Sequence, residues 1–548
     1  MYGLFALSGD CEKMNSIMIE RIIVQGYRCF EDLDVSPNPG MNIIGGDNES
    51  GKSTLLEALA LTLTGKANGR TAREELNPFW FNARSVTEFF DKYGTRDQVA
   101  LPEILIELYL SDRDEFQRLR GVHNSRQVDC PGVLMRIAPA DQYREEFEAY
   151  LRDTPPTVLP VEFYEIEWKD FGDNTLSQRP KELATSFIDS RTIRSTSGVD
   201  YHTREMLSEH LDSKERACIS IAHRKSRQEI TDSTLAGINK RLAEEHSSLH
   251  HRPIGLQMDQ SSRASWETDI VPQVDDIPFA MAGQGQQAAI KVALAMSRTS
   301  GTSTFILIEE PENHLSHTSL TRLIARIEGL AADDQQLFVT THSSFVLNRL
   351  GVDKLLLLHH GSPSKLSDLG EDTVGYFRKL AGYDTLRLVL AERLALVEGA
   401  SDAMVLERAY KDKTGDLPID DGIDIVSMDG LTFKRALELC ACLDRQAIAL
   451  QDNDEHSPAE VRSSVTHLLA DDKRIMLVSD PAKGKTLEPQ ICSVNEDGLL
   501  RRVLHITDRA DPVTWMTNNK TEAALRIFDS DESIAFPDYI EQAVDLLR

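Results

Sequence analysis

The sequence lacks paired cysteines, a membrane-length apolar run and an excess of positive charge. Its 7 cysteines include no CxxC pair, which excludes a disulfide scaffold and the usual zinc-ligand spacing and favours a reducing, cytoplasmic environment. No apolar run reaches the roughly 18 residues of a membrane helix, so we expect no membrane partner. The start of the chain carries no positively charged segment, so we interpret residues 1–17 as an extension rather than a signal peptide.

The charge balance is strongly acidic, because 60 Lys and Arg stand against 88 Asp and Glu in 548 residues, a formal net charge of −28. This charge excludes a protein that coats nucleic acid through bulk electrostatics, but it is compatible with a local basic groove. Residues 220–252 are locally basic; a solvated helix face is the simpler interpretation, and a DNA-binding patch around Arg224 to Arg227 is the alternative. With 41% hydrophobic and 27% charged residues, the chain is suited to several globular domains.

A phosphate-binding loop is the clearest motif. Residues 46–53 read G-D-N-E-S-G-K-S, which fits GxxxxGK[ST], and they lie between a short apolar strand at 41–44 and a helix at 54–61. In such a loop the backbone N–H groups and the helix N-terminus bind phosphates, the lysine reaches the β- and γ-phosphates and the serine ligates Mg²⁺. The motif predicts that ATP and Mg²⁺ are bound by Gly46, Asn48, Gly51, Lys52, Ser53 and Thr54.

Two later strands end in polar residues that suit nucleotide hydrolysis. The apolar run 304–308 leads to Glu309 and Glu310; we assign Glu309 to Mg²⁺, directly or through water, and Glu310 to the role of general base. A second apolar run, which begins at Leu337, ends at His342. A histidine at this position can sense the γ-phosphate and bridge to Glu310.

A turn rich in glycine and glutamine, with Gly283 and Gly285, precedes a helix expected at 288–296. The turn resembles the signature loop of ABC-type ATPases, which contacts the nucleotide held by the opposite subunit. Together with the opening strand at 22–30, the order of motifs resembles the ABC-type ATPase heads of the SMC, RecF and Rad50 group. Because those heads sandwich ATP between two copies, the resemblance implies a homodimer. The sequence E-E-P-E-N-H-L at 309–315 resembles the version found in OLD-family ATPases.

A second group of acids follows two apolar runs in the C-terminal part. One run ends at Glu398, with Asp402 shortly after it, and the other leads to Asp452 and Asp454. Two parallel strands that end in carboxylates can converge at the same edge of a sheet. If the second strand continues, Asp452 and Asp454 point to the same side. Such a cluster stays ionised only with cations, and all-oxygen ligands favour Mg²⁺ or Mn²⁺.

The order Glu-Gly and then Asp-x-Asp resembles a Toprim domain. An ATPase head followed by a Toprim nuclease is the layout of the OLD (overcoming lysogenization defect) family, which Gabija-type and retron-associated nucleases share. The resemblance implies a metal-dependent DNA endonuclease, nicking or cutting both strands, that acts in anti-phage defence, and relatives of this layout have a helicase or a reverse transcriptase with its DNA–RNA product as partner. It also implies residue roles: Glu398 as metal ligand or general base, Asp402, Asp452, Asp454 and Glu488 as metal ligands, and Lys520 as the cation that stabilises the transition state.

We therefore predict an α/β chain in five parts. They are an extension (1–17), the first half of an ABC-type P-loop ATPase head (18–160), a helical insertion for dimerisation (161–260), the second half of the head (261–390), which ends in a connector, and a Toprim α/β domain (391–548). The insertion could equally serve as a lid or a DNA arm.

Two alternatives stay open at this point. One is a RecF- or SMC-like repair or clamp protein whose Toprim domain binds DNA or a partner without cutting. The other, a Toprim topoisomerase or primase, is disfavoured because no room follows the Toprim segment for a domain that carries a nucleophilic tyrosine. The direction of any effect of ATP on cleavage is equally open.

Overall fold

The structure is a computed structural model that describes residues 18–46, 49–67, 70–92, 101–153, 158–189, 211–245, 255–259, 266, 270, 273–274, 276–283, 285–287, 289–290, 304–313, 315–330, 335–359, 362–365, 369–379, 385–391, 393–428, 432–470 and 473–548. The expected extension 1–17, Asn48 and most of the helix expected at 288–296 lie outside these residues.

The N-terminal part begins with an antiparallel sheet in the order β2-β1-β6-β8-β7, with β9 also paired to β8. Its strands are β1 (Ile19–Tyr27), β2 (Phe30–Val35), β6 (Ile104–Leu110), β7 (Arg120–Gly121), β8 (Cys130–Pro139) and β9 (Tyr164–Asp170). Side chains alternate between its two faces, so Ile22 and Val24 join the main core while Ile23 joins a small cluster on the other side. The short elements beside this sheet are β4 (Lys66–Ala67), β5 (Arg70–Thr71), α3 (Ala72–Glu75), α4 (Ala83–Lys92) and α5 (Arg144–Asp153).

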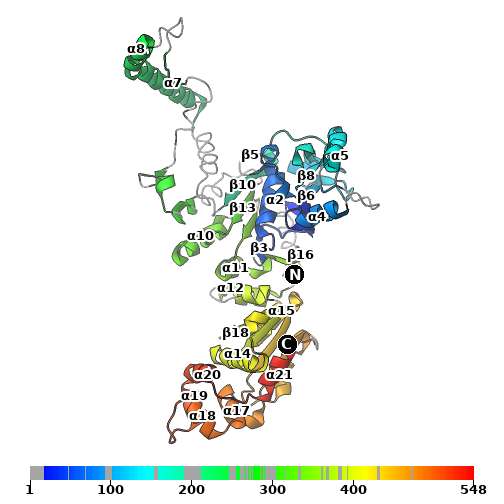
Figure 1. Cartoon of the computed structure of the whole chain (residues 1–548), viewed down its shortest axis with the longest axis vertical. Coiled ribbons are helices and arrows are strands. Elements are labelled where there is room, and N and C mark those ends of the chain that lie inside the picture. Colours follow the sequence, from blue (N-terminus) through cyan, green and yellow to red (C-terminus); the bar gives the residue numbers. More distant parts are fainter. Residues whose placement is uncertain are drawn as a thin grey trace, which may run out of the picture.

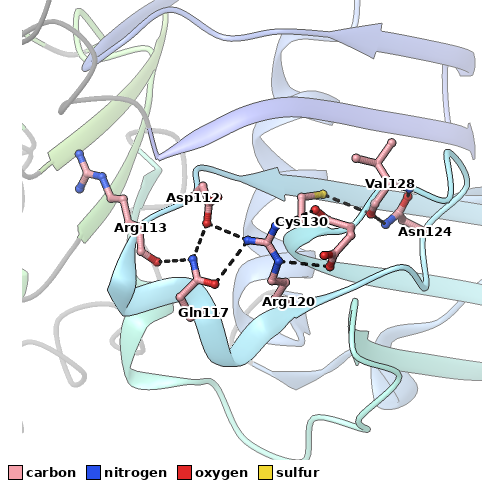
Figure 2. A network of polar contacts seen from close by, with 8 residues as sticks. Asp112, Arg113, Gln117, Arg120, Asn124, Val128 and Cys130 are labelled. Carbon is pink, nitrogen blue, oxygen red and sulfur yellow. Dashed lines mark hydrogen bonds and ion pairs between the residues drawn. The ribbon is translucent and has the colours of Figure 1, made fainter.

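An exposed polar network fixes the loop that joins β6 to β8 (Figure 2). The Arg120 guanidinium donates to the Asp112 carboxylate at 2.8 Å and to the Asp129 carboxylate at 3.2 Å. Gln117 donates to the same Asp112 oxygen at 2.5 Å. Since these groups lie in solvent, the network shapes the loop and contributes little to stability.

A second, mostly parallel sheet, which we call the P-loop sheet, has the order β10-β13-β14-β3-β15-β16, with only the edge strand β16 antiparallel. Its strands are β3 (Met41–Gly46), β10 (Ala184–Asp189), β13 (Thr304–Glu309), β14 (Gln335–Thr340), β15 (Leu355–His359) and β16 (Ser362–Lys365). Helix α2 (Lys52–Thr64) lies between this sheet and the antiparallel sheet and is apolar nearly all round, because both faces are covered (Figure 1). The apolar runs at 41–44 and 304–308 are strands, as predicted.

The start of the predicted helical insertion is wrong. Within residues 161–189, β9 pairs with β8 and β10 pairs in parallel with β13, so this stretch belongs to the two sheets. Within the described residues of 161–260, the first α-helix is α7 (Ser213–Glu229), which runs through a π-helical turn into α8 (Ala236–Glu245) and lies away from both sheets in Figure 1. Strand β9 was not predicted because its exposed positions carry Glu and Lys, and a charged segment of this kind is typical of helix.

The expected connector before residue 391 is a packed layer. Helices α10 (His317–Leu330) and α11 (Ser344–Leu350) cover the free face of the P-loop sheet, and α12 (Glu371–Lys379) and α13 (Thr385–Leu390) pack against α11. Phe377, Leu388 and Val389 are buried in one core that continues into the C-terminal domain. Arg387 on α13 also pairs with Asp424 of that domain at 2.8 Å. The two halves of the molecule therefore share a hydrophobic core.

The C-terminal domain is a parallel sheet in the order β18-β17-β19-β20. Its strands are β17 (Arg393–Val397), β18 (Ile423–Ser427), β19 (Gln446–Gln451) and β20 (Arg474–Val478). Helix α15 (Phe433–Cys442) faces the shared core, and the other face is covered by α14 (Ala400–Thr414), α20 (Lys520–Asp529) and α21 (Asp538–Leu547). The remaining helices are α16 (Pro458–Ser463), α17 (Leu487–Val494), α18 (Asp497–Val503) and α19 (Pro512–Asn518).

Among the described residues, no helix is long and apolar enough to cross a membrane. The predicted α/β fold class, with two parallel sheets each flanked by helices, is confirmed.

Candidate active sites

The phosphate-binding loop lies where β3 ends and α2 begins. Gly51 has a left-handed φ of 99°, and a Cβ there would lie 2.6 Å from the Phe30 ring and 2.8 Å from Cys29 Sγ. At Gly46 a Cβ would lie 2.5 Å from the Leu358 carbonyl oxygen. Both positions therefore require glycine, and the loop closes tightly over the start of α2.

The loop fits a bound triphosphate. Lys52 is buried, and its Nζ donates to the Gly46 carbonyl oxygen at 2.9 Å, which holds the ammonium group inside the loop. The first turn of α2 carries no acidic side chain, so the helix N-terminus and Lys52 present positive charge to an anion. Ser53, the predicted Mg²⁺ ligand, and Thr54 follow in the same turn.

The acids after β13 meet the histidine after β14, because these two strands are parallel neighbours in register, Glu309 opposite Thr340. Glu310 has a left-handed φ of 45° and its N–H donates to the Thr340 carbonyl at 3.1 Å. Its carboxylate lies 3.5 Å from His342 Nε2 and accepts a 2.7 Å hydrogen bond from Asn313. Glu310 and His342 are thus brought together, whereas Glu309 is almost fully buried on the strand itself.

Glu312 also lies at this edge, and the sequence did not predict a role for it. Its carboxylate accepts a hydrogen bond from the Thr341 hydroxyl and another from the His342 backbone N–H, both at 2.7 Å. Burial raises the pKa of this carboxyl group. An acid that follows a proline in a turn normally indicates solvent exposure, so no local signal could have shown that Glu312 holds the end of β14.

The glycine- and glutamine-rich turn begins a helical segment in the described residues. The N–H groups of Gln286 and Gln287 donate to the Gly283 carbonyl at 2.9 and 3.0 Å, with Gly285 in that first turn. A contact between Gly283, Gly285 and a nucleotide in a second copy stays a prediction.

At the carboxyl edge of the C-terminal sheet, Glu398 follows β17 and Asp452 follows β19. The Asp452 N–H donates to Glu398 Oε1 at 2.8 Å, which joins the two strand ends. Asp402, in the first turn of α14, accepts a hydrogen bond from the Gly399 N–H at 3.2 Å. The strand does not continue through Asp454, because β19 ends at Gln451 and Asp454 turns the chain with a φ of 47°, so the condition for Asp452 and Asp454 to share one side of a strand is not met.

Asn453, between the two aspartates, anchors this turn and was not predicted. The side chain is fully buried, and its amide donates to Ser479 Oγ at 2.8 Å and to the Gly484 carbonyl at 2.7 Å. Its carbonyl oxygen accepts from the Glu455 N–H at 2.9 Å. Gln490 on α17 donates to the same Gly484 carbonyl at 2.6 Å, so the turn and the helix that carries Glu488 share an anchor.

Glu488 and Lys520 complete the cluster from two helices. Glu488 is buried on α17, accepts a 2.7 Å hydrogen bond from Thr486 Oγ1 and lies 3.3 Å from Lys520 Nζ at the start of α20. The structure therefore brings together residues that are separated by more than one hundred positions in the chain, from Glu398 to Lys520.

The electrostatics of this cluster are those of crowded, buried acids. Burial, and then the charges of Glu398, Asp402 and Glu488, raise the pKa of Asp452 to about 8, while Lys520 lowers it. Burial and the charge of Glu398 raise the pKa of Asp402 to about 6. The pKa of Glu398 is also raised, first by burial. At neutral pH these carboxyls compete for protons, and a divalent cation would relieve their repulsion.

The donor set is all oxygen, which fits Mg²⁺ or Mn²⁺. Among the described residues, however, no three His, Cys, Asp or Glu side chains are already arranged closely enough to hold an ion. The carboxylates would have to draw together around the metal, which the mutual repulsion of the bare acids opposes.

Comparisons with known proteins agree with this two-part organisation. Residues 389–454 match the family model described as the overcoming lysogenization defect protein-like TOPRIM domain. Residues 21–214 match an AAA domain model, and residues 173–348 match an AAA domain model described as a putative AbiEii toxin of a type IV TA system.

The curated relatives include the DNA replication and repair protein RecF of Streptococcus equi subsp. equi, which is 20% identical over 358 residues that cover 61% of this chain and 94% of RecF. RecF of Streptococcus agalactiae serotype V is 23% identical over 361 residues that cover 59% of this chain and 91% of RecF.

Among solved structures, the recombination mediator RecF with ATP aligns with a TM-score of 0.33 at 13% identity, covering 64% of this chain and 98% of RecF. The SmcHead bound to the C-winged helix domain of ScpA aligns with a TM-score of 0.31 at 12% identity, covering 64% of this chain and 97% of the SmcHead chain. By its family-model matches and its curated relatives, this chain joins an N-terminal, RecF-like P-loop ATPase of the ABC type to a C-terminal OLD-like TOPRIM domain.

Proposed function

We propose that this chain is an ATP-hydrolysing, metal-dependent DNA endonuclease of the OLD type that nicks or cuts duplex DNA in anti-phage defence. The observation that carries the proposal is the grouping of Glu398, Asp402, Asp452 and Glu488 at one edge of the C-terminal sheet, with Lys520 paired to Glu488. A buried group of acids with one lysine beside it suits a phosphodiester bound through divalent cations.

In the ATPase half, Lys52 and the start of α2 would hold the phosphates, and Ser53 with Glu309 would hold Mg²⁺. Glu310 is the general base, since its carboxylate is oriented by Asn313 and lies next to His342. His342 would contact the γ-phosphate and bridge it to Glu310. Gly283 and Gly285 would complete the site of a second copy, which makes the active form a homodimer.

In the TOPRIM half, Mg²⁺ or Mn²⁺ supplies Lewis acidity and a water of lowered pKa when bound. Glu398, Asp402, Asp452, Asp454 and Glu488 are the proposed ligands, with Glu398 also able to accept a proton from water. Lys520 stabilises the negative charge that develops on the phosphate in the transition state. The pairing of Lys520 with Glu488 keeps the ammonium group at the cluster until DNA arrives.

A second candidate is an ATP-driven repair or clamp protein whose TOPRIM domain binds DNA without cutting. It is favoured by the RecF relatives, which match this chain over nearly their whole length. If the first candidate is right, we expect a helicase or a reverse transcriptase as defence partner, and a cytoplasmic location.

Nicking of supercoiled plasmid by the full-length protein in Mg²⁺ or Mn²⁺ separates the two candidates. We expect cleavage that is lost in Asp452→Ala and in Glu398→Ala. Asp444→Asn is the matched control, because Asp444 pairs with Arg474 at the opposite, amino edge of the same sheet. Cleavage by both alanine variants at the wild-type rate would exclude this site, and metal-independent DNA binding without cleavage by wild type would support the clamp.

A further inference from the structure

The loop that follows β20, residues 479–486, carries a lysine to the edge of the C-terminal sheet where the acids lie. The carbonyl oxygen of Gly484, just before Lys485, accepts hydrogen bonds from the Asn453 amide at 2.7 Å and from the Gln490 amide at 2.6 Å. Asn453 belongs to the turn after β19. The backbone that leads into Lys485 is therefore tied to the turn that carries the aspartates.

The residue after Lys485 is tied to the acid cluster as well. The Thr486 hydroxyl donates to the Glu488 carboxylate at 2.7 Å, and Glu488 lies 3.3 Å from Lys520 Nζ. Because consecutive Cα atoms are about 3.8 Å apart, Lys485 leaves the loop directly beside these groups. Its backbone is thus held on both sides before any ligand binds.

The side chain of Lys485 is exposed and loosely paired. It is 62% exposed, and its Nζ lies 3.6 Å from the carboxylate of Glu455, which is itself 78% exposed. The Glu455 N–H donates to the Asn453 carbonyl oxygen at 2.9 Å, so the same asparagine places both members of the pair. An ion pair in solvent contributes little to stability, and the ammonium group can exchange this carboxylate for another anion at small cost.

Two other lysines near this edge are held more closely. Lys520 is 51% exposed and pairs with the buried carboxylate of Glu488. Lys483 is 30% exposed and lies 2.8 Å from Asp538 at the start of α21. Lys485 is therefore the most accessible of these three cations and the one with the longest ion pair.

We propose that Lys485 binds a phosphate of the DNA backbone beside the acid cluster, and that Glu455 holds its ammonium group in place until DNA binds. This rests on the proposed nuclease function. Metals bound by the acids would neutralise the centre, but the neighbouring phosphates also need a cation, and the chain as a whole is strongly acidic. A contact of this kind positions the duplex and reads no sequence.

The first test is Lys485→Ala in the full-length protein. We expect the affinity for a short duplex oligonucleotide, measured with Ca²⁺ in place of Mg²⁺, to fall by roughly 5- to 10-fold. The slope of log affinity against log salt concentration should become shallower by about 1, one phosphate contact. In plasmid cleavage KM should rise while kcat stays near the wild-type value, because Lys485 contacts a phosphate that is not cut.

Glu455→Gln breaks the same ion pair and should have the opposite effect. It frees Lys485 and removes a negative charge from the path of the duplex, so we expect DNA affinity to rise by about 3-fold. A purely structural role of the pair predicts instead that both variants change the affinity in the same direction. Lys473→Ala is the matched control, since this exposed lysine pairs with Asp444 at the amino edge of the sheet; its DNA affinity and KM should equal those of wild type.

Equal affinity and KM in Lys485→Ala and wild type would overturn the role of Lys485 and leave the nuclease standing. Weaker binding by Glu455→Gln, or an equal loss in Lys473→Ala, would also overturn it. If wild type binds the duplex without cutting plasmid, the proposed nuclease fails, and the opposite shifts in affinity of the two variants still decide whether Lys485 contacts the phosphate.

Discussion

The two parallel sheets of this molecule end in acids, and the two edges differ in how those acids are compensated. At the P-loop sheet, Glu310 has His342 at 3.5 Å and Asn313 as a donor, and Glu312 accepts two hydrogen bonds from the end of β14. At the C-terminal sheet, Asp452 and Asp402 have pKa values raised to about 8 and about 6, and Lys520 is the cation that lowers the pKa of Asp452.

The two edges therefore suit different ligands. The P-loop edge offers positive charge from Lys52 and the start of α2, and its acids are already oriented by neighbours, which suits an anion that arrives with its own metal. The C-terminal edge gathers carboxyl groups whose repulsion is relieved by protons or by cations, which suits metals that bind first and then attract a phosphodiester. Four changes test whether the two edges differ in this way.

Glu310→Gln should have the largest effect, and only at the P-loop edge. Removal of the general base should lower ATP hydrolysis by roughly 10²–10⁴-fold, while ATP binding is retained because Lys52 and α2 are untouched. Phosphate release measures ATP hydrolysis, and nucleotide affinity measures ATP binding. Unchanged hydrolysis would place the base elsewhere, and a loss of Mn²⁺ binding at the C-terminal edge would contradict the independence of the two sites.

Asn453→Ala should weaken the C-terminal edge alone. Its amide holds the turn between Asp452 and Asp454, so we expect Mn²⁺ affinity and plasmid cleavage to fall by roughly 10–100-fold, as for other groups that orient metal ligands. Asn174→Ala is the control, since that amide bonds Asp170 in the antiparallel sheet. Mn²⁺ affinity equal to wild type would show that the turn holds without the amide.

Glu312→Ala should lower ATP hydrolysis by about 10-fold, because the Thr341 hydroxyl and the His342 N–H lose their shared acceptor and His342 is held less firmly beside Glu310. Glu312→Gln retains a carbonyl oxygen at this position and should recover most of the activity. Steady-state hydrolysis of both variants measures the effect. Equal loss in the two would mean that charge, and not the hydrogen bonds, is what matters.

The smallest effect concerns pH and metal at the C-terminal edge. The pKa of Asp452 is raised from 3.8 to about 8 in the folded, metal-free protein, so its proton stabilises the fold at low pH and this contribution is lost as pH rises through about 8. A cation replaces the proton. Saturating Mg²⁺ should therefore raise Tm by a few degrees more at about pH 9 than at about pH 6.

The comparison with Asp452→Asn completes that measurement. This variant carries no titrating carboxyl at the position, so the difference between the two pH values should shrink. A Mg²⁺-induced shift in Tm that is equal at both pH values in wild type would mean that Asp452 does not exchange its proton for the metal.

Much of the fold was accessible from local patterns. The apolar runs at 41–44, 304–308 and 394–397 are buried strands, and the polar residues directly after them reach the two edges because parallel strands end on the same side. Local patterns did not show where strand β19 ends, which is at Gln451. They also predicted helix for the residues of β9, because the exposed face of this strand is charged.

The chain by itself determined which chemistries are present: a glycine loop with lysine, two strands ending in acids beside a histidine, and a later set of carboxylates with a lysine. It is the packing of the chain that makes Glu312 and Asn453 hold these groups in place, and that joins the two domains in one core through α12 and α13. The physical reason is that a strand and the residues at its end are local features, whereas a hydrogen bond or a buried charge depends on a partner brought near by packing from a distant part of the chain.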